Sequence, residues 1–384
     1  MITLLKFIQK KTQLQESSVK NTIQLLNDDC TIPFIARYRK ERTGDLDEVQ
    51  IELIVKYKDE FEILDKRKKT IIKVLQEQEI LSNELQEKIN HSDNLIQLED
   101  LYLPFKKKRK TKAETARLNG LEPLAKIIMS QNAHDIDSIA KKYTSTSVLN
   151  ITDTLEGARF IIAEWINERS DIRNKIRYQL EHFALINTKV VKTKEKDKKA
   201  QKFRDYFNWS ESLQSCPSHR LLAILRAEEE GFIRVKIEID NEKALFKIEE
   251  RIINAQNECS VQIQLAIKDA YKRLLFPSLS NEILGIAKEK ADEVAIQVFA
   301  KNLKQLLLGS PLGEKRILAI DPGFRSGCKV VCLDAQGAFK YNETVYPHAP
   351  KNDQIGAIKK ISSLVDAHKI EAIAIGNGTA SRET

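Results

Sequence analysis

Asp321 is the residue whose type and position come closest to a catalytic group. It follows a short apolar segment, residues 316–320, which has the composition of a strand in this chain of 384 residues. Two-metal nucleases hold their ions with carboxylates at strand ends, and several oxygens must converge on two ions about 4 Å apart. The next comparable strand end carries a Gly-Asn-Gly turn at 376–378, and Glu383 lies past that turn. We therefore expect no catalytic residue and no metal site, with Asp321 as a vestigial ligand only.

The other motifs that could bind cofactors are weak or absent. Residues 376–379 fit either a helix start that binds an anion or a tight turn. The six histidines are scattered, and the sequence contains no Walker loop, no GxGxxG segment and no nucleophile elbow. The five cysteines form no CxxC pair, which indicates reduced thiols in a cytoplasmic protein. We expect no ATP, NAD or zinc, and no small-molecule substrate.

Positive charge is most concentrated in residues 106–112. The segment contains five consecutive cations and a sixth after one threonine: Lys106, Lys107, Lys108, Arg109, Lys110 and Lys112. It directly follows the apolar residues 101–105, which could anchor it while its charges face a phosphate backbone. A solvated loop between helices is the alternative, and the clustering favours nucleic-acid binding. Residues 189–202 are also rich in lysine, but acidic residues dilute them, so they fit a solvated face or linker equally well.

A second candidate site lies in residues 32–42, where aromatic residues alternate with cations. Its candidate contacts are Arg37, Arg39 and Lys40. Arginine can bind phosphate through two hydrogen bonds or stack on bases, and a neighbouring tyrosine could stack as well. The alternative is structural: Phe34 and Tyr38 pack inward while the arginines pair with nearby carboxylates. The spacing of four between the two aromatic residues favours this structural alternative.

The overall charge is consistent with a nucleic-acid partner. A formal net charge of +8 favours polyanions, because lysine and arginine release counterions when they meet phosphates. A lysine-rich surface without such a partner would have the same net charge, so the clustering of the cations must distinguish the two interpretations. No run of about 18 apolar residues occurs, which predicts that no helix crosses a membrane.

The elements that would position these residues are helices over the first three hundred residues. A long example begins near Asp45, the expected cap, and carries one apolar stripe: Leu46, Val49, Leu53, Tyr57, Phe61 and Leu64. One stretch, residues 232–240, alternates apolar and charged residues with a period of two and predicts a strand. Glycine and proline concentrate at 309–313, which we interpret as a domain boundary.

Beyond that boundary the pattern becomes that of an α/β domain. We expect strands at 316–320, 327–333, 339–345 and 371–375, with a helix at 353–368 before the last strand. This β-β-β-α-β order is the opening of an RNase H-like domain. Because such a fold needs further elements to cover its sheet, we expect that the chain ends partway through the domain.

Several segments together closely resemble the Tex family of bacterial RNA-binding transcription accessory proteins. The matching motifs follow the family's order along nearly the whole chain: TIPFIARYRKE (31–41), LDEVQ (46–50), LEDLYLP (98–104), KFRDY (202–206), DAYKRLL (269–275), DPGFR (321–325) and GNGTASRET (376–384). The resemblance implies a helical N-terminal region with a helix-turn-helix-like element, followed by a YqgF-type RNase H-like domain that is a degenerate nuclease. Family members carry proline within the basic loop, whereas residues 106–110 are unbroken here.

We therefore expect a multidomain protein with three parts. These are a mainly α-helical N-terminal domain at 1–190, a helical connecting region with one strand at 191–313, and an incomplete RNase H-like domain at 314–384. The expected function is binding of RNA or DNA as a transcription accessory protein that is not an enzyme, with the transcription machinery or the ribosome as further partners. A metal-dependent nuclease centred on Asp321 and a helical scaffold for protein partners are the alternatives.

Overall fold

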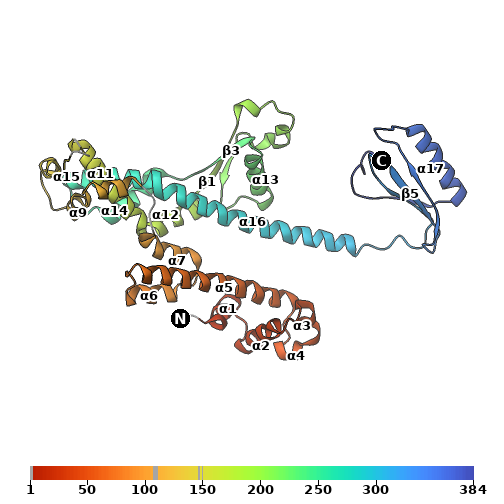
Figure 1. Ribbon diagram of the computed structural model, residues 1–384, viewed down its shortest axis with the longest axis horizontal. Coiled ribbons are helices and arrows are strands. Elements are labelled where there is room, and N and C mark those ends of the chain that lie inside the picture. The colour runs from red at the N-terminus through yellow and green to blue at the C-terminus, as the bar shows by residue number, and fades with distance from the viewer. Residues whose placement is uncertain (1–2, 107–110, 146–147, 149) are drawn as a thin grey trace. The chain divides into compact units, whose positions relative to one another are not determined.

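The computed structural model describes residues 3–106, 111–145, 148 and 150–384 of the chain (Figure 1). These residues form two compact units, Met1–Ala295 and Ile296–Thr384. The first unit is mostly helical with one small sheet, and the second is a four-stranded sheet with a helix. No helix among the described residues is long and apolar enough to cross a membrane.

The N-terminal part of the first unit packs around one long helix, α5 (Glu48–Glu77), shown in orange in Figure 1. Its other helices are α1 (Leu4–Thr12), α2 (Glu16–Asn27), α3 (Ile32–Tyr38), α4 (Lys40–Thr43), α6 (Asn83–His91), α7 (Leu95–Tyr102) and the 3₁₀ turn η1 (Leu103–Phe105). Their shared core is aliphatic and includes Phe7, Ile8, Ile35, Ile51, Ile54, Ile71, Leu75 and Leu98. The helix predicted near Asp45 is thus confirmed.

The predicted cap and stripe of this helix are partly wrong. Asp47, not Asp45, is the N-cap: its carboxylate accepts the N–H of Gln50 at 2.8 Å, and the Gln50 amide oxygen accepts the N–H of Asp47. Val49 is 64% exposed and Leu53 39% exposed, whereas Ile51 and Ile54 are fully buried. The stripe is therefore wrong for the first turns of the helix, whereas Leu46 and Leu64 are buried and Tyr57 and Phe61 pack against the core as predicted.

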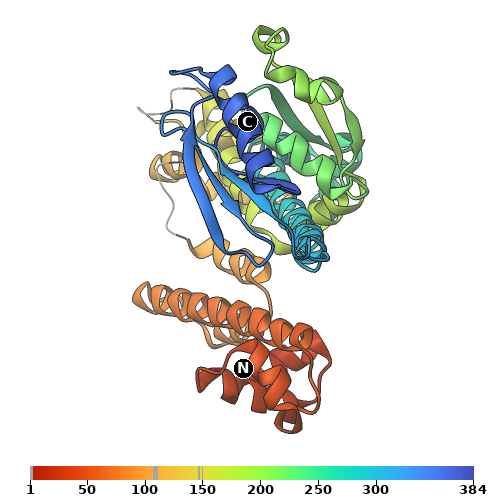
Figure 2. The ribbon, with the colours of Figure 1, turned by 90° about the vertical axis from the view of Figure 1, so that its right-hand side faces the viewer.

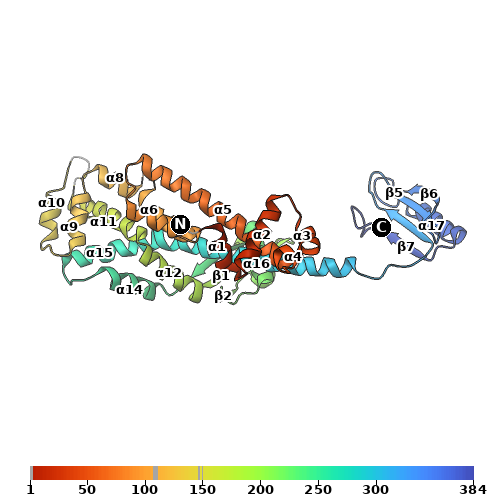
Figure 3. The same cartoon turned by 90° about the horizontal axis from the view of Figure 1, so that it is seen from below.

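The rest of the first unit is a helical bundle (Figure 3). It contains α8 (Lys112–Leu118), α9 (Glu122–Ser130), α10 (Ile136–Lys141), α11 (Ile151–Glu168), α12 (Ser170–Phe183), α13 (Ser218–Glu229), α14 (Asn241–Ile252), α15 (Glu258–Asp269), the π-helical turn η4 (Ala270–Leu275) and the first part of α16 (Phe276–Leu307), whose residues from Ile296 on belong to the second unit. α11 lies in the middle of this bundle and contacts α8, α9, α15 and η4.

A three-stranded antiparallel sheet is part of the first unit, in the order β2-β1-β3, and its strands are drawn in green in Figure 2. Its strands are β1 (Leu185–Val190), β2 (Ser210–Ser212) and β3 (Ile233–Glu238). The strand predicted at 232–240 is confirmed as β3, but the prediction of a single strand is wrong, because β1 and β2 complete the sheet. Residues between β1 and β2 form the 3₁₀ turns η2 (Lys192–Lys194) and η3 (Ala200–Tyr206). The sheet joins residues on both sides of position 190, where we predicted a boundary.

The second unit confirms the predicted β-β-β-α-β order. Its elements are β4 (Ile317–Asp321), β5 (Cys328–Leu333), β6 (Phe339–Val345), α17 (Gln354–His368) and β7 (Ala372–Ile375). The sheet order is β6-β5-β4-β7, with β4 and β7 parallel and the other pairs antiparallel. Apolar residues of α17 pack on one face of this sheet.

The cysteines give a first testable expectation. All five are free thiols, and Cys216 donates a hydrogen bond to the Glu211 carboxylate at 3.1 Å. Burial, followed by this carboxylate, raises the pKa of Cys216 from 9.0 to about 12. Since the thiolate is the nucleophile, a shift of three units lowers its fraction about a thousandfold near neutral pH. We expect iodoacetamide to leave Cys216 unlabelled at pH 8, as measured by peptide mass mapping, and Glu211→Gln to speed its labelling. Rapid labelling of Cys216 in the unmodified protein would contradict this expectation.

Candidate nucleic-acid interface

The site predicted in residues 32–42 lies at the turn between α3 and α4. Pro33 is in the first turn of α3, where its missing N–H costs nothing. Ile35 and Ala36 are buried in the core and Ile32 packs against it, whereas Arg37 and Tyr38 at the end of this short helix are exposed. Arg39 separates the two helices, and Gly44 ends α4 in the left-handed conformation with φ +68°. The local sequence thus places four cations on a tight, rigid bend.

We call Arg37, Arg39, Lys40 and Arg42 the α3–α4 basic corner. All four are exposed, and within the part of the chain that the structure describes none of them forms an ion pair. The guanidinium of Arg39 lies 4.8 Å from the ring centroid of Phe34 and donates to the carbonyl of Tyr38 at 2.9 Å. This contact fixes one cation in place while leaving its remaining N–H groups free to bind an anion.

The structural alternative for this segment is wrong in two respects. Tyr38 does not pack inward, because it is 67% exposed, with its ring 5.5 Å from that of Phe34. The arginines also do not pair with the carboxylates of Glu41, Asp45 or Asp47. An exposed aromatic ring beside unpaired cations is the arrangement that single-stranded nucleic acids bind through stacking and phosphate contacts.

The site predicted in residues 106–112 is anchored at both ends. Lys106 is exposed at the end of η1, and Lys107, Lys108, Arg109 and Lys110 lie outside the described residues. Thr111 caps α8 by accepting the N–H of Glu114 at 3.1 Å. Lys112 is exposed and lies over the ring of Phe160, with its Nζ 4.6 Å from the centroid.

The surroundings of this basic segment also include negative charge. A cavity of about 200 Å³ lies between the two anchored ends, and its lining includes Lys106, Thr111, Glu164 and Glu168. Arg273 lines it as well, and its guanidinium carbon lies 5.4 Å from the centroid of the Phe160 ring. Phe160 therefore has two cations near its ring, and the segment is more electrostatically mixed than its sequence indicates. Arg273 was missed by sequence reasoning, because nothing in the spacing relates it to Lys112.

The structure does not bring the two predicted sites together. The α3–α4 corner adjoins the start of α5, whereas α7, which leads into η1, packs further along that helix, where Arg67 of α5 pairs with Glu99 of α7 at 2.5 Å. At 1.5 Å per residue, the 19 residues from Glu48 to Arg67 span roughly 30 Å. A ligand that contacts both sites must therefore be long, such as a strand of several nucleotides.

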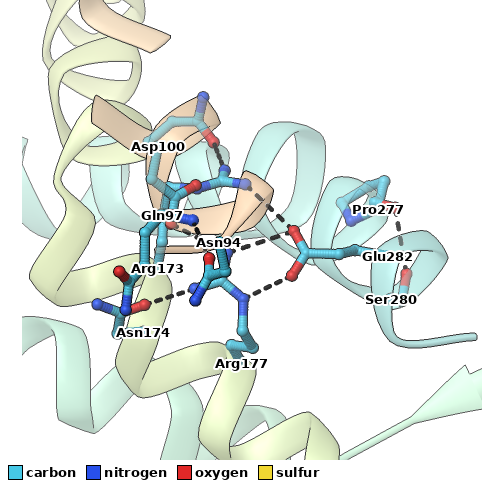
Figure 4. A network of polar contacts seen from close by, with 10 residues as sticks. Asn94, Gln97, Asp100, Arg173, Asn174, Arg177, Pro277, Ser280 and Glu282 are labelled. Carbon is cyan, nitrogen blue, oxygen red and sulfur yellow. Dashed lines mark hydrogen bonds and ion pairs between the residues drawn. The ribbon is translucent and has the colours of Figure 1, made fainter. Parts of the chain in front are cut away.

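A buried ionic network holds α7, and hence the start of the basic segment, on the bundle (Figure 4). Asp100 of α7 accepts hydrogen bonds from Arg173 at 2.6 Å and Arg177 at 3.0 Å, both on α12. Glu282 of α16 accepts a second hydrogen bond from Arg177 at 2.5 Å. Burial alone would lower the pKa of Arg177, but the hydrogen bond with Glu282 and the charge of Asp100 outweigh it, so the pKa is raised. The sequence alone does not indicate this network, because its members lie far apart in the chain.

Asp321 stands at the end of β4, as predicted. The neighbouring strand end, after β7, has the N–H of Gly376 donating to the carbonyl of Ile320 at 2.9 Å. Within the described ranges, no group of three or more histidine, cysteine, aspartate or glutamate side chains could hold a metal ion. The donor set around Asp321 therefore does not fit a two-metal centre.

Three family matches follow one another along the chain. They are described as Tex-like protein N-terminal domain at residues 2–76, Tex central region-like at 131–299, and Tex protein YqgF-like domain at 315–384.

Individual relatives agree with these matches. The uncharacterized protein YdcI of Bacillus subtilis is 39% identical over 98% of this chain and 53% of its own length. The transcriptional accessory protein Tex of Neisseria gonorrhoeae is 38% identical over 95% of this chain and 48% of its own. The human S1 RNA-binding domain-containing protein 1 is 28% identical over 99% of this chain and 39% of its own. The chain spans about half the length of its bacterial relatives. Since three Tex matches cover most of it in order, the chain belongs to the Tex family.

Proposed function

We propose that this chain binds nucleic acid through the phosphate backbone and acts as a transcription accessory protein by contact, not by catalysis. The observation that carries the proposal is the α3–α4 basic corner, with four exposed, unpaired cations beside the exposed ring of Tyr38. Residues 106–112 form a second contact in this proposal. The names of two relatives, a transcriptional accessory protein and an S1 RNA-binding domain-containing protein, support the same class of function.

The proposal includes the organisation of the chain. We place the joint between the helical part and the YqgF-like domain at 309–313, between the end of α16 and the start of β4. We also place a helix-turn-helix-like element among the short helices α1–α4, of which α3 and α4 carry the basic corner. The nuclease alternative receives less support, because among the described residues Asp321 belongs to no group of three or more side chains that could hold a metal ion.

The test is fluorescence-anisotropy binding to single-stranded RNA and duplex DNA over a salt series. Changing Arg37, Arg39 and Lys40 to serine should reduce the slope of log K against log salt by about 2–3, because each phosphate contact contributes about 0.7–0.9. The loss should be similar for all sequences, since phosphate contacts do not read bases.

Two comparisons make this test specific. Replacing the exposed residues Lys141, Lys142 and Lys175 with serine removes the same charge elsewhere on the first unit, and should change the slope by less than one. Serine at residues 106–110 should flatten the slope independently of the basic corner. An unchanged slope in the first triple variant would remove the corner from the interface, and Mg²⁺-dependent cleavage abolished by Asp321→Asn would favour the nuclease alternative.

A further inference from the structure

We propose that a groove beside β3 binds an extended, acidic peptide segment of a partner protein, which adds to the sheet as a further strand. The groove has a volume of about 720 Å³ and lies between β3 and the helices α14, α15 and α16. It belongs entirely to the first unit and is separate from both proposed nucleic-acid contacts. The inference is therefore independent of the proposed function.

The hydrogen bonds of β1 show which backbone groups of β3 face outward. Thr188 and Val190 donate their N–H groups at 2.9 and 2.8 Å to carbonyls of the segment leading into β2. Successive residues of a strand direct their N–H and C=O groups to opposite sides. The backbone groups of Lys189, between Thr188 and Val190, therefore point toward β3. The register pairs Lys189 with Arg234. The backbone N–H and C=O groups of Arg234, and of every second residue after it in β3, therefore point toward β1.

Val235 and Ile237 consequently direct their N–H and C=O groups toward the open edge of the sheet, and Ile239 directly follows the strand. The carboxylate of Glu228 accepts the N–H of Val235 at 2.8 Å and so occupies one end of this edge. Outside the sheet ladder, described residues make no hydrogen bond with the backbone of Ile237 or Ile239. Both residues line the groove. An unpaired strand edge of this kind is a template for an added strand.

The side chains of the groove favour a peptide over a nucleic acid. Its apolar lining includes Leu245, Tyr271, Phe276 and Leu284, which can accept the apolar side chains of an extended segment. Tyr271 is only 5% exposed, and its hydroxyl donates to Asn241 at 2.7 Å. Its ring face is therefore not available for stacking on a base, which single-stranded nucleic acids require.

The charges at the groove select an acidic segment. Lys268 and Lys272 line it, are exposed, and form no ion pair with any described residue. Lys236 reaches only a long contact of 3.9 Å with Glu238, the one acidic side chain among the lining residues that the structure describes. The Glu238 carboxylate also accepts the amide of Asn187 at 2.9 Å, which partly satisfies it. Carboxylates on the partner would pair with the free lysines.

The test uses the full 384-residue chain and a fluorescein-labelled decapeptide of alternating valine and glutamate. We expect saturable binding by anisotropy that weakens at least tenfold in the Lys268→Glu, Lys272→Glu double variant. The matched Lys141→Glu, Lys142→Glu variant makes the same charge change at the C-terminal end of α10 and should bind as the unmodified protein does. The thermal unfolding midpoints of both variants should match that of the unmodified chain, since all four lysines are exposed.

A second probe separates strand addition from simple charge attraction. The same decapeptide with every backbone nitrogen methylated keeps its side chains and charges but cannot donate hydrogen bonds, and we expect it to bind at least tenfold more weakly. Equal binding of the methylated peptide, or no binding of the unmethylated one, overturns the proposal. Displacement of the peptide by a tenfold excess of a 20-nucleotide polyuridine would also overturn it, because the groove would then be a nucleic-acid site.

Discussion

The Asp100→Asn variant should lose about 3–5 kcal/mol of unfolding free energy, a large fraction of the stability of a typical domain. Asp100 and Arg173 have side chains that are each 7% exposed, and the side chain of Arg177 is 10% exposed. Asparagine keeps the shape of the carboxylate but removes its charge. Among the described residues, Glu282 would then be the only anionic partner of the two buried guanidinium groups, whose other contacts are with the amide oxygens of Asn167 and Asn174. A buried charge without its counter-charge is far costlier than the loss of one hydrogen bond.

Urea unfolding followed by circular dichroism measures this effect, and the control is a carboxylate in an exposed pair. Glu84 of α6 pairs with Lys88 one turn later at 2.5 Å, and the two side chains are 77% and 57% exposed. Exposed pairs of this kind contribute little to the unfolding free energy, so Glu84→Gln should change stability little. A loss below 1 kcal/mol in Asp100→Asn would mean that water or a rearranged Glu282 replaces the carboxylate, and that the network does not hold α7 in place.

Local patterns were sufficient to predict the second unit. Its strands alternate or concentrate apolar residues, and turn residues separate them, as at the Asp334–Gly337 reversal, where Asp334 Oδ1 accepts the N–H groups of Gln336 and Ala338. Each element is short and its boundaries carry their own signal. The predicted β-β-β-α-β order therefore agrees with the structure.

The first unit was harder to predict because several helix faces are apolar. In α5, a three- and four-residue spacing passes through Val49 and Leu53 as well as through Ile51 and Ile54. Only packing against α1 and α3 decides that the isoleucines are buried. The predicted cap was wrong because the helix begins at Glu48, so Asp47 directly precedes it, whereas Asp45 lies two residues earlier in the left-handed conformation with φ +61°.

Contacts between residues that are far apart in the sequence determine the remaining structure of the first unit. β2 has no apolar residue, Ser210–Ser212, and exists because it pairs with β1. Asp100 and Arg173 are 73 residues apart, so their ion pair leaves no local pattern. For the candidate interface, the sequence identified the cations, but their freedom from ion pairs and the contact of Arg39 with Phe34 required the structure.

The roles of two glycines inside helices also depend on packing that the sequence does not indicate, and substitutions at these positions can test this. Gly157 lies in α11 and Gly285 in α16, and by sequence alone each would be a weak position in a helix. At Gly157 an added Cβ would overlap the Leu121 side chain and lie 3.5 Å from the Cβ of Ala116. Leu121 is 1% exposed and cannot move aside without disturbing the core. At Gly285 an added Cβ meets no described atom within 4 Å.

Valine at the two positions should therefore have opposite consequences. We expect Gly157→Val to lower the unfolding free energy by about 3 kcal/mol, because overpacking of a filled core forces side chains and backbone apart. Gly285→Val should raise it by a few tenths of a kcal/mol, since valine has a slightly better helix propensity than glycine. Urea unfolding of both variants beside the unmodified chain compares them directly. If Gly157→Val were as stable as Gly285→Val, close packing of α11 against the segment after α8 would not be the reason for glycine at this position.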